Sequence, residues 1–310
     1  MMLPYDPVPW LMKQDGLPAA RARRRLGLDR ASDVETAKDW SHQVTVAAAT
    51  VSPMRAAGVL STLADLHMLD MPVAPVLTER LFEVLQSQPG YEAVCEIAPG
   101  SLQMPCDLGG FFGPYEARNR PEVMAFGAQE MNHYRQYEPL MGPRTPVRPV
   151  PRSSRDRAGP SSCYSWGLIP LSYLIEVLCK AGYAEDARLQ PAINALLGVQ
   201  RESGGWCRNL GGHPSCSLHA VRALGAHPTL RQSAYAVRAL QLLLEHGQQL
   251  NRFALLQVVA LFDLPASRDL ISNVLTQITP HQRKNGSFGT PYPVERVAAV
   301  LAALNTLNER

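Results

Sequence analysis

Charge is scarce in this sequence. Only 18% of the residues are charged and the formal net charge is +3, which gives no reason to expect a polyanionic partner such as nucleic acid. No stretch approaches the roughly 20 consecutive apolar residues that a membrane-spanning helix needs. The first residues lack the basic start and apolar run of a secretory signal. We therefore expect a cytoplasmic protein without a membrane span.

Compact catalytic motifs are missing as well. The sequence contains no glycine-rich phosphate-binding loop, no G-x-S-x-G element and no C-x-x-C pair. Six cysteines are nevertheless present, and in a cytoplasmic chain they should be thiols, metal ligands or catalytic groups rather than disulfides. We expect Cys95 and Cys179 to be small buried hydrophobic residues.

Strand patterns are also rare, and the hydrophobic pattern is helical. Apolar residues, 46% of the chain, recur at steps of three and four, as in Leu189, Ile193 and Leu196. This predicts an all-α protein of short helices joined by Gly/Pro turns. The predicted helices cover residues 55–69, 75–86, 167–180, 188–199, 215–225, 233–246, 268–278 and 294–307.

One segment interrupts this pattern. Residues 139–160 hold six prolines and almost no apolar periodicity, which predicts an extended connection because proline fixes φ and lacks an N–H donor. It divides the chain into an N-terminal helical half, 1–138, and a C-terminal helical half, 161–310. Whether these halves are two domains or parts of one stays open. The only basic run, at arginines 21, 23, 24 and 25, is interpreted as a solvated helix face.

The C-terminal half contains an internal echo. Residues 200–206, QRESGGW, and 282–288, QRKNGSF, share the pattern Q-R-x-x-G-x-aromatic, and each lies between two predicted helices. Glycine permits a tight turn, glutamine can cap a free helix end, and the aromatic ring can fill the gap between hairpins. The echo predicts stacked helical hairpins, with Trp206 and Phe288 buried in equivalent places of successive hairpins.

This echo resembles the Q-x-x-x-G-x-W repeat of squalene cyclases and protein prenyltransferase β subunits, over about residues 160–307. The resemblance implies an α/α toroid, a barrel of stacked helical hairpins around an apolar cavity, with both halves in one toroid. The resemblance is strongest to bacterial cyclase-like proteins of unassigned function. It implies a small hydrophobic or isoprenoid-like substrate. The acidic motifs D-x-D-D and D-D-x-x-D are missing, so a standard terpene cyclase is not supported.

Cysteine and histidine gather at the ends of these predicted hairpins. Cys216 and His219 share a helix face at i, i+3, and Cys163 and Cys207 stand at neighbouring boundaries. Thiolate and imidazole are the ligands that zinc prefers, so Cys163, Cys207, Cys216 and His219 are the predicted metal ligands, with His219 preferred over His213. In prenyltransferase β subunits the motif D-x-C-Y-S-x-W supplies ligands; here Cys163 matches, but Ser161 replaces the aspartate. That departure argues against protein prenyl transfer.

Two other interpretations remain open. Linalool dehydratase-isomerase, of a similar fold class, uses two cavity cysteines as acid and base without a cofactor, and Cys207 and Cys216 could act likewise. Aromatic residues beside Glu116 and Glu130 could support such a site. The candidates are thus an enzyme of transferase, lyase or isomerase type and a non-catalytic helical-repeat protein that binds a ligand or partner. The sequence does not indicate an oligomeric state.

Overall fold

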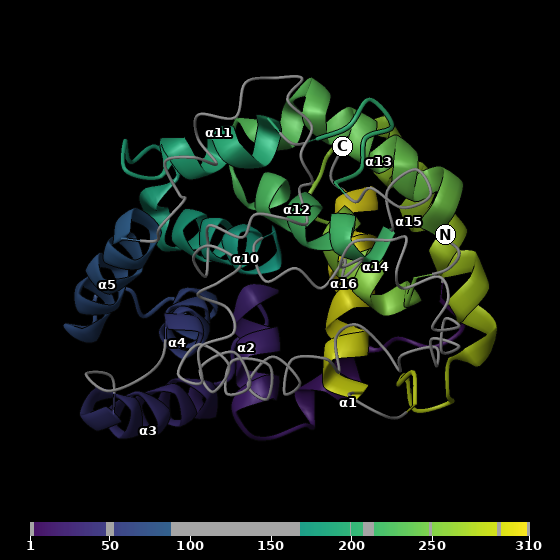
Figure 1. Ribbon diagram of the computed structural model, residues 1–310. Helices are drawn as coiled ribbons and strands as arrows, with labels where there is room; N and C mark the ends of the chain where they lie inside the picture. Colours follow the sequence, from purple (N-terminus) through teal and green to yellow (C-terminus); the bar gives the residue numbers. More distant parts are fainter. Residues whose placement is uncertain are drawn as a thin grey trace, which may run out of the picture.

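The computed structural model describes residues 3–47, 53–87, 168–198, 200–206, 214–247, 250–289 and 293–308. Within these ranges all regular structure is helical, which confirms the predicted all-α class (Figure 1). The proline-rich connection at 139–160 lies outside the described residues. The helices are α1 (Val8–Met12), α2 (Leu17–Arg25), α3 (Ala31–Ala47), α4 (Pro53–Asp65), α5 (Val73–Ser87), α10 (Leu168–Leu178), α11 (Gln190–Gly198), α12 (Pro214–Ala226), α13 (Ala234–His246), α14 (Arg252–Val259), α15 (Pro265–Ile278) and α16 (Pro293–Asn308), with a π-helical turn η5 (Cys179–Tyr183) after α10.

Each helix predicted from apolar periodicity is present, and its ends differ from the predicted ones by about four residues at most. Local capping fixes some of these starts. The Ser233 side chain accepts a hydrogen bond from the Ala236 N–H, and Asn251 accepts from Phe253 and Ala254. Helices α1, α2, α3 and α14 have no counterpart in the predicted set. They are short, or they carry many polar and alanine residues, so their apolar pattern is weak.

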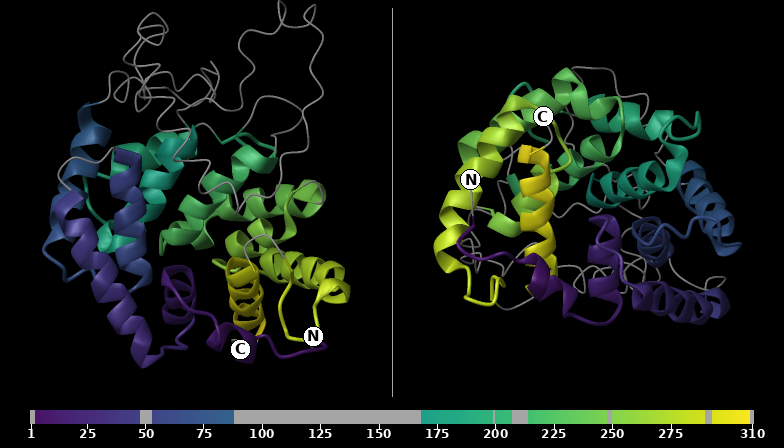
Figure 2. Two further views of the ribbon diagram at one scale, coloured as in Figure 1. Left: turned by 90° about the horizontal axis from the view of Figure 1, so that it is seen from below. Right: turned by 180° about the vertical axis from the view of Figure 1, so that it is seen from behind.

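Six of the described helices pack in a closed order: α2 on α4, α4 on α10, α10 on α12, α12 on α14, α14 on α16, and α16 back on α2. We call these the inner helices. Each also packs against at least one of six outer helices: α3 on α2, α5 on α4, α11 on α10, α13 on α12, α15 on α14 and α1 on α16. In addition, α15 contacts α16 and α1 contacts α2. Figure 2 shows the outer helices at the periphery of the molecule. Because α2 and α4 contact α16 and α10, the described parts of the two halves form one packed body.

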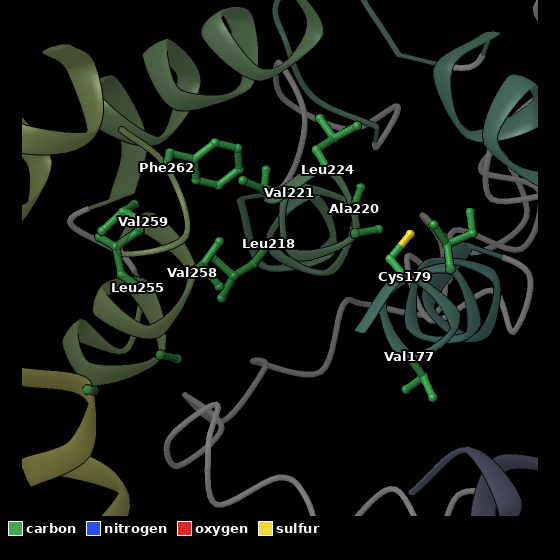
Figure 3. Packing of buried hydrophobic residues seen from close by; sticks show 14 of the residues in the cluster. Val177, Cys179, Leu218, Ala220, Val221, Leu224, Leu255, Val258, Val259 and Phe262 are labelled. Carbon is green, nitrogen blue, oxygen red and sulfur yellow. The ribbon is translucent and has the colours of Figure 1, made fainter. Parts of the chain in front are cut away.

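The inner helices share a core of leucine, valine and alanine. Leu60 of the N-terminal half and Leu174 of the C-terminal half belong to the same buried cluster. Between α12 and α14, Val221 lies beside Phe262 and Leu218 beside Val258 (Figure 3). Burial of such side chains is the main favourable contribution to folding. In the described part of the chain, no helix combines the length and apolarity that crossing a membrane requires.

The two echoed turns have the same hydrogen bonds. In the first, the Gln200 side-chain amide donates to the carbonyl oxygens of Gly204 at 3.0 Å and Tyr235 at 2.9 Å. In the second, the Gln282 amide donates to Gly286 at 3.2 Å and Tyr5 at 2.8 Å. The aromatic residues that follow are both buried, Trp206 with 0% and Phe288 with 4% of its surface exposed. The predicted burial of Trp206 and Phe288 after matching turns is confirmed. The two turns precede α12 and α16, so they do not belong to successive hairpins as predicted.

The glycines of these turns bring a neighbouring backbone close. Gly204 has φ 86° and Gly286 has φ 88°, in the left-handed region that favours glycine. A Cβ on Gly204 would lie 2.1 Å from the Arg238 carbonyl oxygen of α13, and one on Gly286 would lie 2.6 Å from that of Asp6. The segment that leads into α1 therefore packs against the turn at Gly286, just as α13 packs against the turn at Gly204. By this relation α1 is the outer helix of α16.

The interpretation of the arginine run as a solvated face is wrong for Arg23. Its side chain is only 1% exposed and lies where α1, α2 and α3 meet. The guanidinium donates to both carboxylate oxygens of Asp33, at 2.8 Å for Nε to Oδ2, and to the carbonyl oxygens of Leu11 and Gln14. Buried charges of this kind need full pairing, and the α2–α3 hairpin supplies it.

Candidate functional site

Most of the predicted site residues lie outside the described part of the chain. This holds for Cys163, Cys207, Glu116 and Glu130. Cys216 lies in the first turn of α12, but its side chain is not described, whereas His219 is described on the same helix. Among the described residues alone, no group of three or more His, Cys, Asp or Glu side chains is placed to hold a metal ion. The predicted zinc site therefore stays a prediction.

The structure shows instead a group of charged side chains on four inner helices. Glu176, near the end of α10, is 2% exposed and forms a two-pronged ion pair with Arg222 of α12. Arg222 Nε donates to Glu176 Oε2 at 3.0 Å, and Nη2 donates to Oε1 at 2.8 Å. This parallel geometry is among the strong arrangements of charged hydrogen bonds. It ties α10 to α12, the neighbours in the closed order.

Lys180 and Asp65 extend the group to α4 and α2. The Lys180 ammonium, in the π-helical turn η5, lies 2.9 Å from Glu176 Oε1 and 3.9 Å from Asp65 Oδ1. Asp65, the last residue of α4, accepts a hydrogen bond from Arg21 of α2 at 2.5 Å. Cations are favoured at a helix C-terminus, where carbonyl groups lack partners. We call Arg21, Arg25, Asp65, Glu176, Lys180 and Arg222 the charged cluster.

Both carboxylates of the cluster are held ionised. Burial acts strongly to raise the pKa of Glu176, but Arg222 and Lys180 outweigh it and bring that pKa well below its usual range. Burial likewise acts to raise the pKa of Asp65, and Lys180, Arg21 and Arg25 bring it down to about 2. Neither group can therefore donate a proton at neutral pH.

Arg25 differs from the other cations of the cluster. Its side chain is exposed, and within the described part of the chain it has no hydrogen bond and no carboxylate at ion-pair distance. Desolvation nevertheless lowers its pKa, with Asp65 acting against this and Arg21 and Arg222 adding to it.

His219 lies beside this cluster on α12. The ring is partly buried, and its pKa is lowered to about 4, first by burial and then by the positive charge of Arg222, against a smaller opposite effect of Glu176. At neutral pH the imidazole is uncharged. A neutral imidazole is the form that coordinates a metal or accepts a proton. His219 thus has the protonation state that the predicted site requires.

Cys179, in contrast to His219, is not in the protonation state that binds a metal. It is buried in the core between α10 and its neighbours (Figure 3), and burial, with Glu176 and Glu185, raises the pKa of its thiol to about 12. A thiol that stays protonated is a poor nucleophile and metal ligand. The expectation that Cys179 is a packing residue is confirmed, while Cys95 lies outside the described residues.

Sequence reasoning missed the charged cluster, although one signal pointed to it. Glu176 is the only charged residue in α10, whose sequence is LIPLSYLIEVL. A single carboxylate in an otherwise apolar helix indicates a buried, paired charge.

Comparisons of the chain with protein-family models, with curated proteins and with solved structures gave no match in any of the three.

Proposed function

We propose that the chain is an α/α toroid. The closed packing order of the inner helices supports this, because helices that pack from α2 through α16 and back to α2 leave no free edge. The repeated turns support it as well. Residues 5–7 seat on the turn before α16 as α13 seats on the turn before α12, so the two ends of the chain complete one series of hairpins.

We further propose that the protein is an enzyme, of lyase, isomerase or transferase type, acting on a small hydrophobic or isoprenoid-like molecule between the inner helices. The observation that carries this proposal is the position of His219. Its imidazole is uncharged at neutral pH, lies one helical turn before Arg222 of the ionised Glu176–Arg222 pair, and follows Cys216 by three residues on α12. Perturbed titratable groups are typical of functional sites.

The residues proposed for a metal are Cys163, Cys207, Cys216 and His219. Three thiolates and an imidazole form a donor set that suits zinc, and the neutral ring of His219 fits that set. Bound zinc would supply a Lewis acid. If no metal binds, Cys207 and Cys216 are the proposed proton donor and acceptor, supported by Glu116 and Glu130.

Metal analysis of purified protein tests this proposal. We expect about one zinc per wild-type chain, and loss of zinc in Cys216→Ser and in His219→Ala. Cys179→Ala is the matched control, because this thiol is buried and protonated, and it should retain the metal. Wild-type protein without zinc would exclude the metal site, and so would zinc loss of the same size in Cys179→Ala.

A second candidate is a non-catalytic binding protein. The observation that favours it is the pairing of Glu176 and Asp65, which leaves neither described carboxylate of the cluster able to act as an acid at neutral pH. Farnesol serves as a probe that separates the two candidates. Recovery of bound but unchanged farnesol favours the binding protein, and conversion that is lost in Cys216→Ser favours the enzyme.

A further inference from the structure

We propose that Asn285 is a site of spontaneous modification, and that its deamidation to isoaspartate releases the N-terminal segment from the turn at Gly286. Asn285 is the only asparagine of the chain that a glycine follows. Because glycine has no side chain to shield its backbone nitrogen, an asparagine before glycine deamidates more readily than one before a larger residue. The site lies apart from the cysteine–histidine group, so the proposal does not depend on the proposed enzymatic activity.

The turn presents the Asn285 side chain to water. Residues 283–285 are exposed, whereas Gly286 and Ser287 are buried. The Asn285 side-chain oxygen Oδ1 accepts hydrogen bonds from the Ser287 backbone N–H at 3.1 Å and from the Ser287 hydroxyl at 2.9 Å. The Gly286 N–H donates to the Arg283 carbonyl oxygen at 2.8 Å. Water can therefore reach the amide, and the Gly286 nitrogen becomes free to react each time this turn opens.

The reaction needs only hydroxide and water. The Gly286 backbone nitrogen loses its proton to hydroxide and attacks the Asn285 side-chain carbon Cγ. An N–Cγ bond forms, the Cγ–Nδ2 bond breaks, and ammonia leaves. One water molecule then opens the resulting five-membered imide. Attack of water at Cγ gives aspartate, and attack at the backbone carbonyl carbon of residue 285 gives isoaspartate. The net change is the uptake of one water and the release of one ammonia, without oxidation or reduction.

The two products should affect the turn differently. The aspartate product keeps side-chain oxygens that can accept from Ser287, so the turn stays closed. In isoaspartate, the Cβ atom of residue 285 enters the main chain before the Gly286 nitrogen. Two backbone hydrogen bonds span this point, from the Gly286 N–H to the Arg283 carbonyl and from the Arg283 N–H to the Ser287 carbonyl, both at 2.8 Å. The inserted atom changes the length of both loops, so isoaspartate is not compatible with this turn.

The N-terminal segment is held by the same turn. One Gln282 side-chain amide donates to the carbonyl oxygens of Gly286 at 3.2 Å and Tyr5 at 2.8 Å. Gly286 also lies so close to the segment that an added Cβ would be 2.6 Å from the Asp6 carbonyl oxygen. A longer main chain at residue 285 therefore moves Gly286 either against Asp6 or away from Gln282. Either movement loosens residues 5–7.

Ageing of purified full-length protein tests the modification site. The protein is incubated at mildly alkaline pH, which promotes loss of the amide proton, and peptide mapping by mass spectrometry measures aspartate and isoaspartate at each asparagine. We expect Asn285 to deamidate faster than Asn251. Asn251 is the matched internal control, because its side-chain oxygen also accepts two hydrogen bonds but arginine follows it. Deamidation of Asn251 at the same rate or faster would overturn the proposal.

Hydrogen exchange of residues 5–12 tests the release. In aged wild-type protein, a population equal to the isoaspartate fraction should exchange about twofold to tenfold faster than fresh protein, the effect of losing one or two hydrogen bonds. Fresh Asn285→Asp carries the charge of the products without the longer main chain, and it should exchange like fresh wild type. Aged Asn285→Gln controls for other ageing, because glutamine would have to form a six-membered imide, which is much slower.

Two results would contradict the release. One is unchanged exchange of residues 5–12 in protein that contains isoaspartate at position 285. The other is equal acceleration in fresh Asn285→Asp or in aged Asn285→Gln, which would assign the effect to charge or to damage elsewhere. Circular dichroism of every variant checks that the helical fold is intact.

Discussion

Gln282 and Tyr5, which are 277 residues apart in sequence, hold each other by two hydrogen bonds. The Gln282 side-chain amide N–H donates to the Tyr5 backbone carbonyl at 2.8 Å, and the Tyr5 backbone N–H donates to the Gln282 side-chain oxygen Oε1 at 3.1 Å. The first of these bonds corresponds to the one between Gln200 and Tyr235. One side chain therefore fastens the N-terminal segment to the last hairpin of the chain.

Replacing Gln282 should loosen this connection. We expect Gln282→Ala to lower the free energy of unfolding by about 0.5–1.5 kcal/mol, because the two hydrogen bonds to the exposed Tyr5 backbone and the part-buried one to Gly286 are lost. Hydrogen exchange should show faster opening of residues 5–12 than in wild type. Gln241→Ala is the control: its amide bonds only to the exposed Glu245 of the same helix, and its effect should stay below about 0.5 kcal/mol. Equal effects of the two variants would contradict the role assigned to Gln282.

The tight turn at Gly204 gives a second prediction. Gly204→Ala should lower the free energy of unfolding by more than the roughly 1–2 kcal/mol that a positive φ costs alone, because the new Cβ would collide with the Arg238 backbone. Gly198→Ala is the matched control, since it lies at the end of α11 with open space around it. It should be neutral or slightly stabilising. Urea unfolding of both variants measures the difference.

The repeated turns could be predicted from the sequence because their determinants are local. Glutamine, glycine and the aromatic residue stand within seven positions, and each interaction within the turn follows from that spacing. The helices of regular apolar period could be predicted for the same reason. The partner of each turn, Tyr235 in one case and Tyr5 in the other, could not be predicted, since nothing local to Gln282 indicates the far end of the chain.

The charged cluster could not be predicted because its parts come from residues 21 to 222. Glu176 alone indicated a buried charge, but the identity of its partners depends on the relative rotation of α10 and α12 and on the π-helical turn that carries Lys180. The interpretation of the arginine run as a solvated face was wrong at Arg23 for a related reason. Its composition is that of a solvated face, and only the packing of α3 against α2 places Asp33 beside Arg23.

Glu176 should be important for stability in proportion to its burial. Glu176→Leu leaves Arg222 and Lys180 without their carboxylate in a partly buried place, and we expect a loss of about 3–5 kcal/mol in the free energy of unfolding. Adding Arg222→Met should recover part of this loss, because one of the two cations that Glu176 neutralises is then removed. Urea unfolding of the two single variants and the double variant gives a double-mutant cycle, which measures the interaction free energy of the pair. A double variant that is less stable than Glu176→Leu would contradict the pairing.

His219 gives the last prediction, which concerns pH. The pKa of its ring is about 4 in the folded protein, against 6.5 for the free side chain. As the pH falls below 6.5, the unfolded chain takes up a proton that the folded protein binds only near pH 4. The contribution of His219 to stability is thus fully present above about pH 6.5 and is lost progressively as the pH falls toward 4. At pH 5 the loss relative to pH 7 should be about 2 kcal/mol.

His219→Asn isolates this effect, because it removes the titrating group and keeps a polar side chain of similar size. We expect the free energy of unfolding of the variant to change less between pH 7 and pH 5 than that of wild type. The stabilisation from Asp65, whose pKa is about 2 against its ordinary 3.8, is fully present above about pH 4 and is lost only below that pH. It therefore contributes little to the change in stability between pH 7 and pH 5. His246→Asn is the control, since His246 is exposed on α13, and it should keep the wild-type slope. If the slope is lost in His246→Asn and kept in His219→Asn, the His219 ring is not the group that burial holds neutral.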